Sequence, residues 1–314
     1  MASFLVTGGA GFIGSNLVAA LVARGDDVRV LDDFSTGFRE NLAAVASRID
    51  IVEGDLASPE DCARAAQDMD YILHQGALPS VARSVADPLL SHTINATGTL
   101  NVLNAAQKAG VKRLVYASSS SVYGDQAVEY KHEGLPMNPQ SPYAAAKASG
   151  EHYLRAFSNC FGLETVALRY FNVFGPQQDP NSAYSAVIPL FVNAMLDGKS
   201  PTIHGDGLQA RDFTFVENNV QANIRAATGD FVARGQAYNI ACGTSYTLLD
   251  LVAALNAELG TEIGAEHVKS RVGDIRISKA DIGRAQQDLG YNVSVSFDEG
   301  LRRTIAWYRE QRNL

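Results

Sequence analysis

The stretch TGGAGFIG, residues 7–14, is the feature that most restricts how this chain can fold. It follows SFLVT, a short apolar run typical of a buried strand, and it opens an amphipathic pattern over residues 13–24 that predicts a helix. Gly8, Gly11 and Gly14 permit a tight turn and close approach of the backbone to a pyrophosphate, which the helix N-terminus stabilises. The loop therefore predicts a dinucleotide site; the alternative is a glycine-rich turn without a ligand.

Apolar runs alternate with helical patterns along the first 175 residues. We expect strands at 3–8, 27–33, 49–56, 69–77, 111–119 and 164–172, and helices at 13–24, 58–67, 93–109 and 141–161. Ser58 is an expected N-cap, with Pro59 at the first helical position. This alternation predicts an α/β fold, a doubly wound (Rossmann) parallel sheet with right-handed crossovers.

The alternation of strand and helix patterns weakens after about residue 175, where GPQQDPNSAYS predicts a polar loop. Short strands at 201–205, 236–241 and 265–270 and helices at 217–228, 247–258 and 297–310 indicate a smaller C-terminal α/β region. We expect residues 1–175 to form an NAD-binding domain and residues 176–314 to form mainly a substrate-binding region, with the chain free to cross back between them.

Carboxylates follow two of the expected strands. Asp32 ends the second strand, where it can accept hydrogen bonds from the adenosine ribose and would repel a 2′-phosphate, which favours NAD over NADP. The adjacent Asp33 disfavours NADP further. Asp55 either contacts the adenine amino group or caps the turn after the third strand.

Composition excludes several functions. The net charge of −8 without a basic block argues against nucleic-acid binding. Cys62, Cys160 and Cys242 form no CxxC pair, and the six histidines show no ligand spacing, so we expect no metal. No secretion signal or membrane span is expected, and these observations together predict a cytoplasmic protein.

The run SSSS, residues 118–121, ends the fifth expected strand, and Tyr143 and Lys147 lie four residues apart on an expected helix. Read alone, the run is compatible with a polar turn and the Tyr-xxx-Lys spacing with chance. A phenol has a pKa of about 10, and a nearby cation together with the positive nicotinamide ring favours the phenolate. Tyr143 could then act as a general base beside a hydride acceptor.

The motifs TGGAGFIG, SSSSVYG, SPYAAAK and RYFNVFGP, in this order, resemble the extended short-chain dehydrogenase/reductase family over essentially the whole chain. Within it the chain is most similar to NAD-dependent UDP-hexose and UDP-N-acetylhexosamine 4-epimerases. The resemblance implies inversion at C4 of a UDP-sugar through a 4-keto intermediate, with NAD bound throughout. UDP-glucuronate 4-epimerase, another C4-oxidising enzyme and a non-catalytic NAD-binding sensor are the alternatives.

The resemblance also implies residue roles. Ser119, Tyr143 and Lys147 are the expected catalytic residues. Related dehydratases carry an acidic pair where Ser120 and Ser121 stand, so elimination of water is disfavoured. The further cofactor residues implied are Phe12, Ile13, Gly37, Leu56, Gln75, Ala77, Asn95 and Phe171. The further substrate residues implied are Ser80, Ser120, Asn172, Arg211, Arg271, Asp274 and Ser278.

Two implications concern partners. Ser278 stands at a position where a small residue leaves room for a 2-acetamido group, which implies acceptance of UDP-GlcNAc and UDP-GalNAc as well as UDP-Glc and UDP-Gal; an ordinary polar residue there is the alternative. The helices at 93–109 and 141–161 match those that relatives pair into a four-helix bundle, which implies a homodimer. Their apolar residues could equally pack within one chain.

Overall fold

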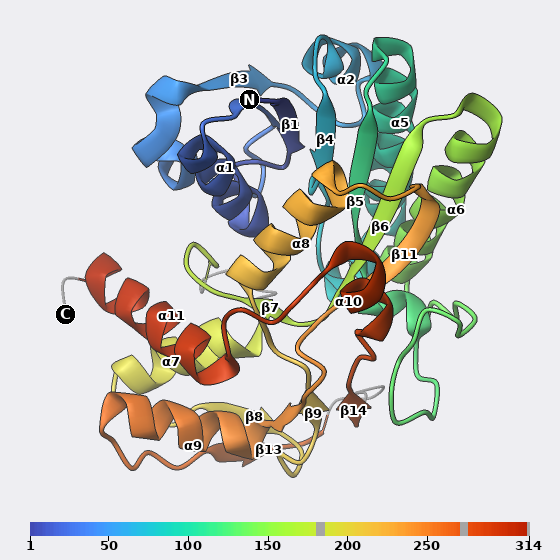
Figure 1. Cartoon of the computed structure of the whole chain (residues 1–314). Coiled ribbons are helices and arrows are strands. Elements are labelled where there is room, and N and C mark those ends of the chain that lie inside the picture. The colour runs from blue at the N-terminus through green and yellow to red at the C-terminus, as the bar shows by residue number, and fades with distance from the viewer. Residues whose placement is uncertain (180–185, 271–275, 313–314) are drawn as a thin grey trace.

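The computed structural model describes residues 1–179, 186–270 and 276–312. At its centre, seven parallel strands form one sheet in the order β11-β6-β5-β4-β1-β2-β3 (Figure 1). These strands are β1 (Ser3–Thr7), β2 (Asp27–Asp32), β3 (Ile49–Glu53), β4 (Tyr71–His74), β5 (Arg113–Ser119), β6 (Glu164–Tyr170) and β11 (Arg234–Ile240). The first six follow the order 3-2-1-4-5-6 of doubly wound dinucleotide-binding folds, which confirms the predicted fold class.

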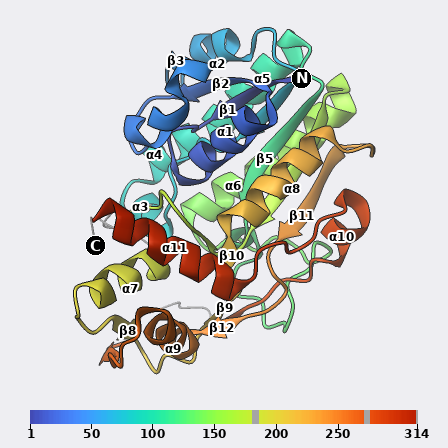
Figure 2. The same ribbon diagram turned by 60° about the vertical axis from the view of Figure 1, so that its left-hand side comes forward.

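Helices cover both faces of the sheet (Figure 2). On one face, α1 (Phe12–Arg24), α8 (Val216–Thr228) and α10 (Gly283–Leu289) pack on the strands through buried side chains such as Leu17, Leu21 and Val220. On the other, α2 (Pro59–Ala66), α5 (Gly98–Ala109) and α6 (Pro142–Phe161) do so through side chains such as Leu103 and Leu154. Helices therefore cover both faces of the sheet and shield them from water, as is typical of parallel sheets.

Ser58 caps α2 as predicted, because its hydroxyl accepts a hydrogen bond from the Asp61 amide at 3.2 Å and Pro59 follows it. The helix expected at 93–109 begins earlier. Asp87 caps α4 (Pro88–His92) by accepting from the Leu90 amide, and a single π-helical turn (Thr93–Thr97) joins α4 to α5. The short helix α3 (Val81–Ala86) precedes them.

The segment expected as a C-terminal strand at 236–241 is the seventh strand of the main sheet, β11, which pairs with β6. Together with α8 it lies C-terminal to residue 175 in sequence but within the sheet layers in space (Figure 1). The chain thus crosses out of the first region, returns to it and leaves again.

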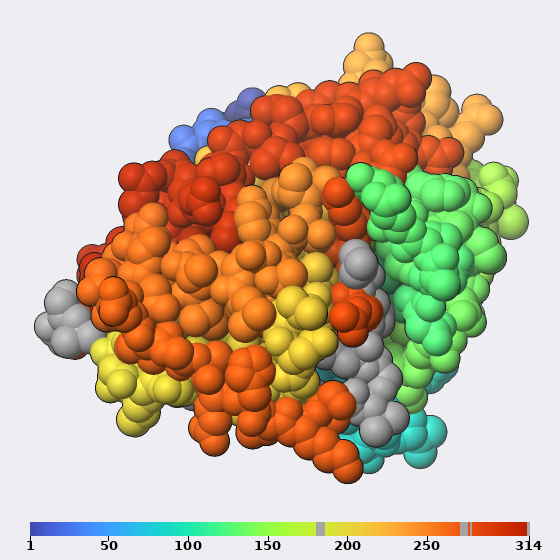
Figure 3. Space-filling view, turned by 90° about the horizontal axis from the view of Figure 1, so that it is seen from below, coloured from blue at the N-terminus to red at the C-terminus, as the bar shows by residue number. Residues whose placement is uncertain are grey.

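The rest of the C-terminal part has its own core, built from buried aromatic and aliphatic side chains such as Phe174, Phe213, Leu251 and Phe297. Its helices are α7 (Val187–Leu196), α9 (Leu248–Leu259) and α11 (Phe297–Gln311). Among its short strands, β7 (Val173–Phe174) pairs with β10 (Thr214–Phe215), and β8 (Thr202–His204) pairs with β13 (Glu266–Val268). The strand β9 (Ala210–Arg211) pairs with both β12 (Tyr246–Thr247) and β14 (Ile277–Ser278). Figure 3 shows its orange and yellow surface beside the green segment that links β5 to α6.

No helix within the described ranges combines the length and the apolar character needed to cross a membrane. In those same ranges, His, Cys, Asp and Glu side chains do not gather in a group of three or more that could hold a metal ion.

Candidate active site

The serine run splits at the carboxyl end of β5, because successive side chains of a strand point to opposite faces. Ser118 turns toward the inner side of α6 and donates a 2.5 Å hydrogen bond to Glu151. Ser119 faces the other way, where its hydroxyl accepts from the amide and the hydroxyl of Ser121 and lies close enough to the Tyr143 phenol to influence its pKa. Ser120 begins the 3₁₀ turn η3 (Ser120–Tyr123).

Tyr143 and Lys147 lie one turn apart on α6, which Ser141 caps by accepting from the Ala144 amide. Burial raises the pKa of Tyr143 to about 12, and the nearby Ser119 hydroxyl lowers this pKa in part. Burial also lowers the pKa of Lys147 to about 7. The Lys147 nitrogen lies 5.9 Å from the centre of the Tyr143 ring.

From the sequence, a nearby cation is expected to lower the pKa of the phenol. The pKa of Tyr143 is instead raised. Among the chain's own groups, desolvation is the dominant influence on Tyr143 and Lys147, and it favours the uncharged form of each. The positive nicotinamide ring of bound NAD⁺ is a further charge that would favour the phenolate.

A cavity of about 900 Å³ lies along the carboxyl edge of β1, β2 and β4, at the point where the strand order reverses. The expected cofactor residues that line it are Gly8, Gly11, Phe12, Ile13, Gly14, Asp32, Asp33, Gly37, Asp55, Leu56, Gln75, Ala77, Tyr143 and Lys147. Ser80, expected to contact substrate, lines the same cavity.

The glycine loop fits a dinucleotide by its geometry. Gly8 has φ +66°, and a Cβ on it would lie 2.6 Å from the Cα of Gly76, so a side chain is excluded there. A Cβ on Gly14 would lie 2.0 Å from the carbonyl oxygen of Gly8. The first turn of α1 lines the cavity, and the first N–H groups of a helix have no partner within it. They can therefore bind a pyrophosphate.

The carboxylates around the cavity are held by backbone amides. Asp32 accepts from the amides of Ala10 and Phe34 at 2.8 and 2.9 Å, and its burial raises its pKa. Asp33 accepts from Ser35, and Asp55 accepts from the Ala57 amide, a turn-capping contact that coexists with its place in the cavity wall.

Two expected cofactor residues are not among those that line the cavity. Asn95 is buried and hydrogen-bonds the amide and the carbonyl of Leu78, a residue that lines the cavity. Phe171 is also buried and packs against Tyr123, with ring centres 6.3 Å apart. Asn95 therefore supports the wall from outside, whereas Phe171 belongs to a buried cluster with Tyr123.

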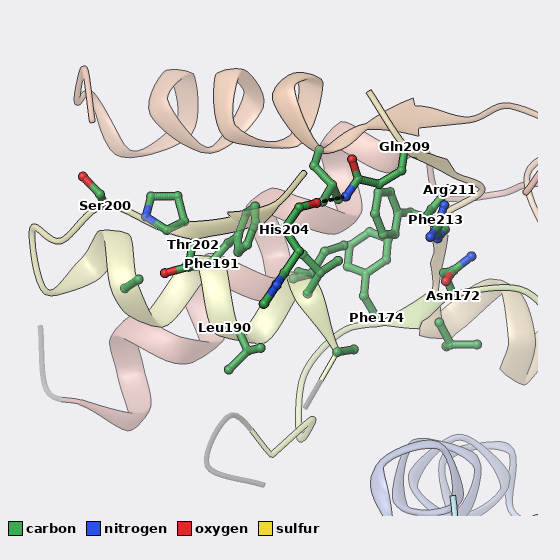
Figure 4. Close-up of a pocket in the computed structure, with 17 residues that line it drawn as sticks. Asn172, Phe174, Leu190, Phe191, Ser200, Thr202, His204, Gln209, Arg211 and Phe213 are labelled. Carbon is green, nitrogen blue, oxygen red and sulfur yellow. Dashed lines mark hydrogen bonds between the residues drawn. The ribbon is translucent and has the colours of Figure 1, made fainter. Parts of the chain in front are cut away.

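A second cavity, of about 570 Å³, lies in the C-terminal part between α7, β8 and β9 (Figure 4). Arg211 and Asn172 both line it, and Asn172 also donates to the Asp212 carbonyl at 3.3 Å. Ser278 is buried beside Arg211, its partner across β9 and β14, and is not among the residues that line either cavity. Arg271 and Asp274 lie outside the described residues.

The structure adds residues that the sequence did not reveal. His204 and Gln209 line the second cavity, where Gln209 donates to the His204 carbonyl at 2.7 Å (Figure 4). Gln177 lines the first, and its side chain hydrogen-bonds Ser15 of α1 and the carbonyl of Asn41. The only sequence signal for Gln177 was its place in a polar loop. His204 lies in the strand expected at 201–205 and Gln209 precedes β9, but no motif marked either as a cavity residue.

A doubly wound sheet that sets a Tyr-xxx-Lys helix beside a glycine loop defines the class of extended short-chain dehydrogenases/reductases. The model of the NAD dependent epimerase/dehydratase family matches residues 4–241, and the chain belongs to that family. Membership confirms the predicted fold class, the assignment as an enzyme and NAD as the cofactor.

Individual relatives include two 4-epimerases and a 4,6-dehydratase. A UDP-glucose 4-epimerase of Mycolicibacterium smegmatis is 38% identical over 98% of each chain. The structure of a UDP-N-acetylglucosamine 4-epimerase from Methanobrevibacter ruminantium in complex with UDP-N-acetylmuramic acid is 40% identical over 99% of each chain, with a TM-score of 0.94. A dTDP-glucose 4,6-dehydratase of Streptomyces griseus is 34% identical over 98% of this chain and 94% of its own.

Proposed function

We propose that this enzyme inverts C4 of a UDP-hexose or UDP-N-acetylhexosamine through a 4-keto intermediate. One observation carries the proposal: Tyr143 lines the cavity of the glycine loop with the Ser119 hydroxyl next to its phenol, while the neighbouring Ser120 and Ser121 offer no carboxylate. Elimination of water, as in the dehydratase relatives, needs an additional acid and base. Oxidation and re-reduction at a single carbon needs only one proton-transfer group beside the hydride acceptor.

In this mechanism, NAD supplies the hydride acceptor and later the hydride donor when it is bound. Tyr143 takes the proton of the 4-hydroxyl as general base, and Ser119 orients the same oxygen. Lys147 stabilises the phenolate form that burial disfavours, and would hold the nicotinamide ribose of bound NAD. After the 4-keto sugar has turned its other face, Tyr143 returns a proton to the 4-oxygen.

The second cavity suits the nucleotide diphosphate that tethers the turning sugar. Arg211 offers a fork of donors matched to phosphate oxygens, and Asn172 offers a neutral donor nearby. Arg271 at a second diphosphate contact, Asp274 at the uridine ribose and Ser120 near the sugar remain part of this proposal. The apolar part of the wall, including Phe174 and Phe213, suits a base.

The proposal extends to 2-acetamido sugars because Ser278 is small and adjoins Arg211. Incubation with UDP-Glc, UDP-Gal, UDP-GlcNAc, UDP-GalNAc and UDP-glucuronate, without added NAD, followed by separation of C4 epimers, tests the substrate class. We expect conversion within both the acetylated and the non-acetylated pair. Conversion of UDP-glucuronate alone, or formation of a 4-keto-6-deoxy product, would contradict the proposal.

We also propose a cytoplasmic homodimer. Large apolar side chains are exposed on neighbouring helices: Val85 of α3, Leu89 of α4, at 79% exposure, and Tyr153 and Phe161 of α6. A patch of this kind is typical of a protein interface, and a second copy of the chain offers the same patch about a two-fold axis. Free thiols at Cys62, Cys160 and Cys242 are typical of a reducing compartment.

A further inference from the structure

A buried ion pair lies directly behind the serine run. The guanidinium of Arg169 on β6 binds both carboxylate oxygens of Glu151 on α6, at 2.9 and 2.7 Å, and each side chain is only 4% exposed. The same carboxylate accepts the 2.5 Å hydrogen bond from Ser118. Glu151 therefore joins α6, β5 and β6 at one point.

The spacing along the chain places this point beside the catalytic groups. Glu151 follows Lys147 by four residues, as Lys147 follows Tyr143, so the three side chains share one face of α6. Ser118 immediately precedes Ser119 and pairs with Arg169 in the ladder between β5 and β6. The carboxylate of Glu151 thus connects the Tyr143 helix to the residue beside Ser119.

Arg169 is fixed in turn. Its guanidinium lies 4.7 Å from the centre of the Tyr123 ring, and the Tyr123 hydroxyl donates to Asn239 of β11 at 2.7 Å. The pair is held by rigid elements on both sides, so its geometry cannot relax easily.

Such a pair contributes little net stability, because the cost of removing two charges from water offsets their attraction. What a bidentate guanidinium–carboxylate contact does define is distance and orientation. A displacement of about 1 Å in a reacting group can lower the rate on the order of 10²-fold. A contact that fixes α6 against β5 can therefore affect the rate directly.

We propose that Glu151, held by Arg169 and Ser118, is a positioning residue that sets the distance between the Ser119 hydroxyl and the Tyr143 phenol. The proposal rests on the proposed C4 epimerisation, in which both groups act on the same oxygen. Glu151 itself does not line the cavity.

The test compares Glu151→Gln with Glu164→Gln. Glu164 pairs with Arg113 at the opposite end of β5 and β6, at 2.6 Å, so its substitution perturbs an ion pair of the same strands away from the site. We expect Glu151→Gln to lower kcat about 10- to 100-fold, with KM for the UDP-sugar and bound NAD within about threefold of wild type, and Glu164→Gln to retain wild-type kcat. An equal loss in both variants, or a loss confined to KM, would overturn the proposal.

A double variant, Glu151→Gln with Arg169→Met, separates positioning from stability, because it removes the unpaired buried charge. We expect its melting temperature to recover toward wild type while kcat stays low; recovery of kcat together with stability would show a merely structural role. Crystal structures of wild type and Glu151→Gln give a readout independent of substrate. A changed distance between the Ser119 hydroxyl and the Tyr143 phenol supports the proposal even if no UDP-sugar is converted, whereas an unchanged distance counts against it.

Discussion

The side-chain nitrogen of Lys147 lies 2.8 Å from the carbonyl oxygen of Ala117 and donates a hydrogen bond to it. Ala117 is two residues before Ser119 on β5, so this bond ties the helix of Tyr143 to the strand of Ser119. It is also the bond that partly compensates an amine that is 2% exposed. Lys147 therefore carries an energetic cost in the fold that its proposed role in catalysis explains.

We predict that Lys147→Met stabilises the protein and abolishes epimerisation. Because the folded-state pKa is about 7 and the unfolded value about 10.5, the unfolded chain binds a proton that the folded chain lacks between these pH values, and wild-type stability rises with pH across this window. The gain from the substitution is then largest below pH 7, on the order of 3 kcal/mol after loss of the hydrogen bond to Ala117. It shrinks as the pH rises toward 10.5.

Urea unfolding of both proteins at about pH 6.5 and about pH 9.5, on either side of the folded-state pKa, measures this difference. A variant that is less stable than wild type at the lower pH, or a gain that grows with pH, would show that Lys147 is charged and stabilising in the fold.

Tyr143→Phe should leave the fold and bound NAD intact and lower kcat at least about 10³-fold, because the phenol is the proposed proton acceptor. Ser119→Ala should lower kcat about 10- to 100-fold, since one hydrogen-bond donor to the reacting oxygen is lost. Tyr238→Phe is the matched control: Tyr238 is a buried tyrosine of β11 whose hydroxyl donates to Asp288, outside both cavities. A Tyr143→Phe enzyme with wild-type turnover would refute the mechanism.

The sequence predicted those parts of the fold and site in which local pattern and function coincide. The glycine loop, the carboxylate at Asp32 and the N-cap at Ser58 are each readable within a few residues. The place of β11 is not, because its register against β6 depends on contacts between residues far apart in the chain. The opposite directions of Ser118 and Ser119 likewise require the strand register.

The second cavity is likewise difficult to predict from local sequence patterns. Its wall is assembled from Asn172, His204, Gln209 and Arg211, which lie on separate short strands and turns. The strands expected at 201–205 and 265–270 contain β8 and β13, but β9 has only two residues, too few to show a periodicity. Asn95 is an expected cofactor residue, but only its hydrogen bonds to Leu78 reveal that it supports the wall.

Gly14→Ala should abolish NAD retention and destabilise the fold, because the added Cβ would lie 2.0 Å from the Gly8 carbonyl oxygen, a backbone atom that cannot move aside cheaply. We expect a loss of about 1–3 kcal/mol, as for overpacking elsewhere. Gly264→Ala is the control, since a Cβ added there would have open space around it in the described part of the chain. The nucleotide content of the purified variants, from absorbance after denaturation, checks this; full NAD content in Gly14→Ala would contradict it.

Leu89→Glu should convert the proposed dimer to a monomer, because a charge in the centre of an apolar interface leaves a buried carboxylate without a partner. Leu249→Glu on α9, also at an exposed leucine, should leave the assembly unchanged. Light scattering coupled to gel filtration gives the mass directly. Wild-type protein that is monomeric, or a dimer that tolerates Leu89→Glu, would place the interface elsewhere or remove it.

Arg211→Met should weaken binding of UDP itself, because the proposed contact is to the diphosphate and not to the reacting sugar. One charge-assisted contact contributes about 1.5–3 kcal/mol, so we expect Kd for UDP to rise about 10- to 100-fold in calorimetry. KM should rise with it, while kcat at saturating substrate falls much less, since Tyr143 lies in the wall of the other cavity. Arg303→Met on α11, which removes a surface guanidinium paired with Glu217 and Glu299, controls for the change in net charge. An unchanged Kd in Arg211→Met would remove the second cavity as the nucleotide site, and with it the proposed tether about which the sugar turns.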